Sequence, residues 1–220
     1  VGNIVHPGEY KLDRMKSGKS KTLETFKRIG EKNILAILQD STGATKPGHS
    51  IPEETVVENI EEIFKAAPGR IIVGTFASLL DRLYEIIKVA EKMGKVVMTS
   101  GFSMKTNIQI AQNLGYMKIG RGVMVNLEDM GQYDDKKLVI LCTGAQGEPD
   151  ASLMRIGNGE HRHIKTKPGD TFIFSSSVIP GNERSIQRLK DSLYRKCDNV
   201  IHKEIMDVHG GGHGLVEDIK

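Results

Sequence analysis

Apolar runs of strand length recur along the chain, and each is followed by a turn and then by a segment of helical periodicity. The runs cover residues 34–38, 70–75, 95–99, 137–142, 170–174 and 199–202. The helical segments cover residues 52–66, 78–93, 107–114 and 182–194. Strands that are apolar on both faces and alternate with amphipathic helices are typical of a parallel sheet covered on both sides. The pattern therefore predicts a three-layer α/β domain over about residues 48–208.

The loops after the predicted strands carry most of the candidate chemistry, because ligands of such sheets bind beyond the carboxyl ends of the strands. Hydroxyl groups and backbone N–H groups at helix starts form pockets for phosphate. Serine, threonine and aspartate also cap helices, so a purely structural role is the alternative for each loop. No loop has a Walker A or Gly-x-Gly-x-x-Gly pattern that would indicate a nucleotide cofactor. The predicted phosphate-binding residues are Ser41, Thr42, Ser100, Gly101, Ser103, Gly144, Gln146, Gly147, Glu148, Ser175 and Ser176.

A glycine-rich turn near the C-terminus contains two histidines, His209 and His213, separated by three glycines. Glycines let the backbone approach a ligand closely, and an imidazole can ligate a metal or hold a phosphate oxygen near neutral pH. The turn is therefore a candidate phosphate site that includes His209, Gly211, Gly212 and His213. A glycine-rich turn with incidental histidines is the alternative.

Composition narrows the classes of partner. A chain of 220 residues that is 38% hydrophobic can bury one sizeable core or two small ones. The net charge of +3 suits an anionic ligand but not the non-specific coating of nucleic acid, so any basic groove must be local. Cys142 and Cys197 lie far apart and Cys142 falls in an apolar run, which favours a reducing cytoplasm over a disulfide or a zinc ribbon.

No stretch approaches the roughly 18 apolar residues of a membrane-spanning helix, so we expect no membrane partner. The chain begins like the middle of a strand and ends like the middle of a helix. We therefore expect it to be a piece of a longer protein.

Six ordered strings of residues resemble one known family. They are residues 8–13, 38–42, 68–78, 144–149 (Gly-Ala-Gln-Gly-Glu-Pro), 173–183 (which includes Ser-Ser-Ser-Val-Ile-Pro-Gly-Asn-Glu) and 208–214. In this order they resemble ribonuclease J, of the β-CASP branch of the metallo-β-lactamase-fold nucleases. The resemblance implies a metallo-β-lactamase domain with two zinc ions and an inserted β-CASP domain that closes a groove over RNA. It implies that residues 1–47 are part of the metallo-β-lactamase domain, that residues 48–208 form the β-CASP domain, and that residues 209–220 return to the first domain.

The resemblance also assigns roles to three residues. Asp40 falls on an acidic motif and His213 on a histidine motif, which implies that both are catalytic, with Asp40 orienting His213 or a metal-bound water. The alternative for Asp40 is a cap of the next turn. Glu9 stands where the family has the aspartate that bridges the metals. Its extra methylene adds about 1.5 Å of reach, whereas zinc–oxygen distances are held at about 2.0–2.2 Å, so the bridge would have to be rebuilt or abandoned.

Two departures from the family limit what this chain can do. The His-x-His-x-Asp-His metal motif is absent, so we expect the zinc site to be absent or incomplete. Gly211 stands where the family commonly has a serine that grips the terminal phosphate. The resemblance thus implies part of a metal-dependent 5′–3′ exonuclease or endonuclease of cytoplasmic RNA processing and decay, and we expect this chain to bind RNA without hydrolysing it. The alternative is a non-catalytic β-CASP-like nucleic-acid-binding module.

The partner that the resemblance implies is single-stranded RNA, preferably with a 5′-monophosphate, and the intact protein would be a homodimer or tetramer. Phe102, Tyr116 and Tyr133 are candidate stacking platforms for a base, with packing in the core or at its rim as the alternative. His161 and His163 lie in a basic segment, which we interpret as a solvated hairpin.

Overall fold

The computed structural model describes residues 2–13 and 20–220, and the chain divides into two compact units. The larger unit is Val57–Val208, and the smaller unit combines Val1–Val56 with His209–Lys220. The domain assignment made from the sequence remains a prediction, with its first boundary at residue 47 rather than 56.

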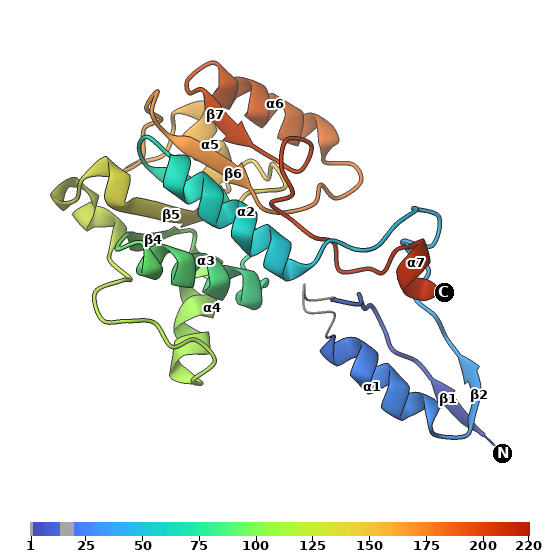
Figure 1. Ribbon diagram of the computed structural model, residues 1–220. Helices are drawn as coiled ribbons and strands as arrows, with labels where there is room; N and C mark the ends of the chain where they lie inside the picture. Colours follow the sequence, from blue (N-terminus) through green and yellow to red (C-terminus); the bar gives the residue numbers. More distant parts are fainter. Residues whose placement is uncertain (1, 14–19) are drawn as a thin grey trace. The chain divides into compact units, whose positions relative to one another are not determined.

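The larger unit is built on a parallel sheet of five strands in the order β4-β5-β3-β6-β7 (Figure 1). The predicted α/β class with a parallel sheet is confirmed. The strands are β3 (Ile71–Gly74), β4 (Val96–Ser100), β5 (Leu138–Cys142), β6 (Thr171–Phe174) and β7 (Asn199–Ile201). The helices are α2 (Glu53–Ala66), α3 (Leu80–Lys92), α4 (Phe102–Asn113), α5 (Ser152–Asn158) and α6 (Glu183–Tyr194), with short 3₁₀ helices at Leu127–Gln132 and Asp135–Lys137.

The central strand β3 explains why the strand sequences are apolar throughout. Ile72 pairs in register with Ile140 of β5 and with Phe172 of β6, and all residues of β3 are buried. On one face these strands pack against α5 and α6 through Leu153 and Leu189, while α2 and α3 lie on the other face (Figure 1). Burial on both faces removes the polar alternation that a half-exposed strand would show.

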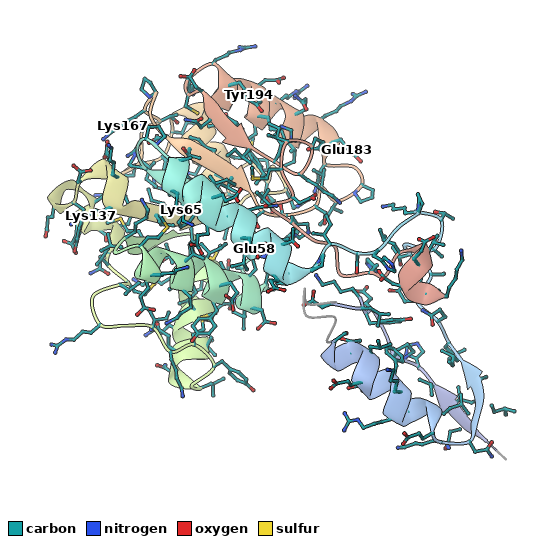
Figure 2. All side chains as sticks on the ribbon, viewed as in Figure 1. Glu58, Lys65, Lys137, Lys167, Glu183 and Tyr194 are labelled. Carbon is teal, nitrogen blue, oxygen red and sulfur yellow. The ribbon has the colours of Figure 1, made fainter. Side chains whose placement is uncertain are left out.

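The two edges of this sheet differ. Lys137 and Lys167 mark the edge where β5 and β6 begin, and Glu183 lies beyond the edge where β6 ends (Figure 2). At the first edge, Arg70 binds Asp170 in a bidentate ion pair, with Nε to Oδ1 at 2.8 Å and Nη2 to Oδ2 at 2.7 Å. Both side chains are buried, so this pair ties the starts of β3 and β6 together.

The smaller unit contains a β-α-β arrangement of its own. Strands β1 (Asn3–Val5) and β2 (Ile34–Ile37) pair in parallel, α1 (Lys21–Gly30) connects them, and α7 (Val216–Ile219) lies near the C-terminus. The first apolar run, residues 34–38, lies outside the range predicted for the three-layer domain and does not join the five-stranded sheet. It forms β2, which pairs with β1 and leaves Leu35 and Ile37 71% and 52% exposed.

Some helices also begin at residues other than those that the sequence periodicity predicts. The helix predicted over residues 107–114 begins at Phe102, because Gly101 adopts a φ of +124° and turns the chain directly from β4 into α4. Helices α1 and α5 were not predicted, since α1 is dominated by polar residues and α5 is only seven residues long. No helix among the described residues is long and apolar enough to cross a membrane.

Candidate functional site

Asp40 and His213 come together in the smaller unit although 173 positions separate them. Asp40 follows β2, and His213 lies in the glycine-rich turn before α7. The imidazole donates a hydrogen bond from Nδ1 to Asp40 Oδ2 at 2.8 Å, and Asp40 Oδ1 accepts the N–H of Thr42 at 3.0 Å. The carboxylate therefore caps its own turn and also binds the imidazole, and a catalytic role of either residue remains a prediction.

This arrangement fixes the charge of Asp40 and the orientation of His213. The hydrogen bond from His213, followed by that from the Thr42 N–H, lowers the pKa of Asp40 from its ordinary 3.8 to about 2. Asp40 is thus ionised at neutral pH, and a carboxylate on Nδ1 leaves Nε2 as the atom through which the ring can reach a ligand. The His213 side chain is 31% exposed, so it is accessible from solvent.

Close backbone contact holds the two segments that carry this pair. A Cβ atom added at Gly43 would lie 2.1 Å from the carbonyl oxygen of Gly214, so only glycine fits there. Gly214 in turn donates its N–H to the carbonyl of Tyr10 at 2.8 Å, and Val216 donates to the carbonyl of Lys46 at 3.0 Å. Segments from both ends of the chain therefore form one frame around His213.

Asp218 of α7 is a buried anchor of this frame that the sequence analysis missed. Its carboxylate accepts the Ser50 N–H at 2.7 Å and the Leu215 N–H at 3.2 Å, and it contacts His49 Nδ1 at 2.8 Å. Burial opposes its ionisation, but these hydrogen bonds outweigh burial and hold its pKa below the ordinary value. The only signal in the sequence is an acidic residue in the first turn of a short helix.

The other predicted residues of the glycine-rich turn differ in their surroundings. His209 is buried, and a Cβ atom at Gly210 would lie 2.9 Å from the carbonyl oxygen of Ile51. Gly211 and Gly212 face open space, with no atom within 4 Å of an added Cβ. The turn thus leaves room beside His213, and the phosphate-binding role of these residues remains a prediction.

The donors near His213 do not fit a zinc site by themselves. Glu9 is exposed, and Ser41 and Thr42 lie at the surface beside Asp40. Within residues 2–13 and 20–220, no group of three or more His, Cys, Asp or Glu side chains could hold a metal ion. A catalytic zinc requires three protein ligands and a water, so we derive no step of chemistry through a metal held by these residues.

In the larger unit, Gln146 joins the loops that follow β5 and β6. Its amide donates to the carbonyl of Ser177 at 2.6 Å and accepts the Ile179 N–H at 2.8 Å. The neighbouring Gly147 has a φ of +74°, and a Cβ there would lie 2.7 Å from Cβ of Ser185. The side chain of Gln146 is therefore used inside the protein to shape these loops, while Glu148 next to it is exposed.

Ser175 and Arg82 form a second internal connection in the larger unit. The Ser175 hydroxyl donates to the carbonyl of Val208 at 2.7 Å and accepts from Arg82 Nη1 at 2.7 Å. Arg82 also donates to that carbonyl, at 3.0 Å. Ser175 and Ser176 are both buried, and Arg82 was missed because nothing in its helical sequence distinguishes it from a surface arginine. Contact of Ser175 and Ser176 with RNA remains a prediction.

Ser100 is the last residue of β4, Gly101 follows it, and Ser103 lies in the first turn of α4. Ser100 is buried and its hydroxyl contacts Ser152 and His161, whereas Ser103 is exposed on α4. The interpretation of His161 as part of a solvated hairpin is wrong, because the ring is 6% exposed and its Nδ1 accepts backbone N–H groups.

A sequence model of the family described as "Ribonuclease J, beta-CASP domain" matches residues 68–193, which include β3 to β6. The chain belongs to the ribonuclease J family. It is 34% identical to ribonuclease J of Helicobacter pylori, 37% identical to that of Thermus thermophilus and 38% identical to that of a Synechocystis strain, over its whole length in each case. It covers 32%, 38% and 34% of those proteins, so it spans about a third of the length of these ribonuclease J relatives. The resemblance seen in the sequence motifs is confirmed.

Proposed function

We propose that this chain is the RNA-binding part of a metal-dependent ribonuclease, to which it contributes a β-CASP domain and the Asp40–His213 pair. The observation that carries the proposal is that pair. Two residues on family motifs at opposite ends of the chain meet at 2.8 Å, and the contact leaves Nε2 of His213 for a ligand. Hydrolysis of phosphodiester bonds, with zinc as the metal, is proposed for the whole ribonuclease rather than for this third of it.

The proposed ligand is single-stranded RNA with a 5′-monophosphate. Support comes from the imidazole beside Gly211 and Gly212, where open space and backbone N–H groups suit a phosphate group. We propose the cytoplasm as the compartment, which the two free, buried thiols of Cys142 and Cys197 support.

Oligonucleotide binding by the 220-residue chain tests this function. His213→Ala should weaken binding of a 5′-phosphorylated RNA by roughly ten- to a hundred-fold, the usual worth of a hydrogen bond to a charged group. The substitution should reduce the affinity for the same RNA with a 5′-hydroxyl much less, because that RNA presents no terminal phosphate to the imidazole. His6→Ala is the matched control, since it removes an exposed imidazole from the same unit.

Two results would contradict the proposal. No binding of RNA by the unaltered chain would remove the RNA-binding role. If His213→Ala reduced the affinity for the two oligonucleotides equally, His213 would not lie at a terminal-phosphate pocket. Binding of both RNAs should weaken as salt rises, because phosphate contacts release counterions.

A further inference from the structure

A cavity of about 420 Å³ lies in the larger unit beside the carboxyl end of β4, away from Asp40 and His213 in sequence and outside their unit. One wall is α4, which contributes Phe102, Lys105, Gln109 and Gln112. The other wall is the segment 124–128, and Ser100 and Gly101 lie between the two. Such a volume is within the range of pockets that hold small organic groups.

Both walls are anchored to the sheet. Val97 of β4 donates its N–H to the carbonyl of Val123 at 2.7 Å, and Val125 donates back to Val97 at 3.0 Å. The segment 123–125 therefore runs along the outer edge of β4, with Met124 paired to Val97. One wall, α4, begins directly after β4, and the hydrogen bonds of Val123 and Val125 to Val97 hold the other wall against the edge of the sheet.

The hydroxyl at the base of the cavity is not a nucleophile. Nδ1 of His161 accepts the N–H groups of Ile164 at 3.0 Å and His163 at 3.2 Å, so the ring proton lies on Nε2. Nε2 then donates to the Ser100 hydroxyl at 2.9 Å and cannot take a proton from it. Burial lowers the pKa of His161 to about 4, which keeps the ring neutral. The Ser100–His161 contact thus supports the floor, and the cavity is suited to binding rather than to hydrolysis.

The side chains around the opening are suited to a flat, neutral, polar group. Phe102 lines the cavity and is 88% exposed although it is a large apolar residue. Gln109, Gln112 and Asn126 form no side-chain hydrogen bond with any residue that the structure describes, so their amides can both donate and accept. The lining holds one cation, Lys105, and one carboxylate, Glu128, so its formal charge is zero. A zero charge disfavours a phosphate dianion.

We propose that this cavity binds a nucleobase of single-stranded RNA, with the base stacked on Phe102 and its edge facing the amides of Gln109, Gln112 and Asn126. The inference rests on the proposed RNA-binding function and adds a second contact to it. Of the three aromatic residues considered from the sequence, Phe102 lines the cavity, Tyr116 does not, and Tyr133 packs against the core.

The test is binding of a 5′-phosphorylated oligoadenylate that carries the fluorescent base 2-aminopurine to the 220-residue chain. Phe102→Ala should weaken binding by about five- to a hundred-fold, the range for loss of one base stack on an aromatic ring, and should remove the quenching of the fluorescent base. Phe102→Tyr should retain both, because the ring remains. Leu114→Ala is the control, since it removes a similarly exposed apolar side chain next to α4 but outside the cavity.

The salt dependence of RNA binding distinguishes a contact with a base from contacts with phosphates. Phe102→Ala should leave the slope of log K against log salt unchanged, whereas each lost phosphate contact lowers that slope by about 0.7 for a single strand. If the unaltered chain binds RNA but Phe102→Ala binds it equally well, the inference is wrong and the RNA-binding function stands. If no RNA binds, both proposals are wrong. If Phe102→Ala changes only the self-association of the chain, Phe102 belongs to a protein interface, which also overturns the inference.

Discussion

Asp40 shows how one side chain can serve two purposes at once. One carboxylate oxygen accepts the Thr42 N–H and the other accepts a hydrogen bond from His213 Nδ1, so Asp40 caps the turn after β2 and also orients an imidazole from the other end of the chain. Because the charged form of Asp40 accepts both hydrogen bonds, ionisation of Asp40 and formation of the pair are coupled. The pair should therefore respond to acid.

We predict that the Asp40 carboxyl titrates near pH 2 in the folded chain, below its ordinary pKa of 3.8. A lowered pKa in the folded state means that Asp40 stabilises the fold above about pH 4 and that this contribution is lost as the pH falls toward 2. Carboxyl ¹³C NMR measures the midpoint directly. In His213→Ala the midpoint should rise toward 3.8 but stop short of it, because the Thr42 N–H still favours the charged form. A midpoint of 3.8 in the unaltered chain would contradict the pairing.

At the scale of elements, the candidate site depends on backbone packing between segments that are distant in sequence. The turn after β2 lies against the segment before α7, with Gly43 in contact with the Gly214 carbonyl. Asp218 closes the same frame through Ser50 and Leu215. The backbone around His213 is therefore positioned by contacts that do not touch its imidazole, while Asp40 orients the ring.

Gly43→Ala should destabilise this frame, because the new methyl group would lie 2.1 Å from a backbone oxygen that cannot rotate away. Over-packing of this kind costs about 1–3 kcal/mol, and the Asp40–His213 hydrogen bond should weaken with it. Urea unfolding followed by NMR signals of the smaller unit gives the free energy. Gly30→Ala at the end of α1 is the control, since nothing lies within 4 Å of its added Cβ. That control should leave stability unchanged or raise it by less than about 1 kcal/mol. Equal effects of the two substitutions would show that the close approach is unimportant.

At the scale of the whole molecule, the chain has a complete sheet but an incomplete set of metal donors among its described residues. The five-stranded sheet is covered on both faces, and the buried Arg70–Asp170 pair joins the starts of β3 and β6. No metal-holding group of side chains accompanies Asp40 and His213 in the part of the chain that is described. We therefore expect this chain to bind RNA without cleaving it.

We predict that the purified 220-residue chain binds RNA but neither holds stoichiometric zinc nor cleaves the RNA, because a catalytic zinc needs three protein ligands and a water. Zinc quantification by atomic absorption and a labelled-RNA cleavage assay at saturating RNA measure the two properties on one preparation. Zinc at one or two equivalents together with turnover would refute this prediction.

The sequence by itself determined the class of the larger unit and the family. Strands buried on both faces must be apolar at every position, so their runs are visible without a structure, and the long motif strings carry the family resemblance. The same reasoning did not predict that β2 pairs with β1, because an apolar run does not reveal which strand it pairs with. Strand pairing is a property of the whole fold.

Tertiary structure alone decided which candidate residues are exposed to solvent and which form hydrogen bonds inside the protein. Ser100 ends a strand and Gln146 and Ser175 come after strands, yet each uses its polar side chain inside the protein. Only the fold revealed Asp218, Arg82 and the cavity beside Phe102, because each depends on contacts between residues far apart in sequence. Local patterns report how a segment buries its own side chains. They cannot report which distant backbone groups those side chains will meet, and those contacts decide what remains free to bind a ligand.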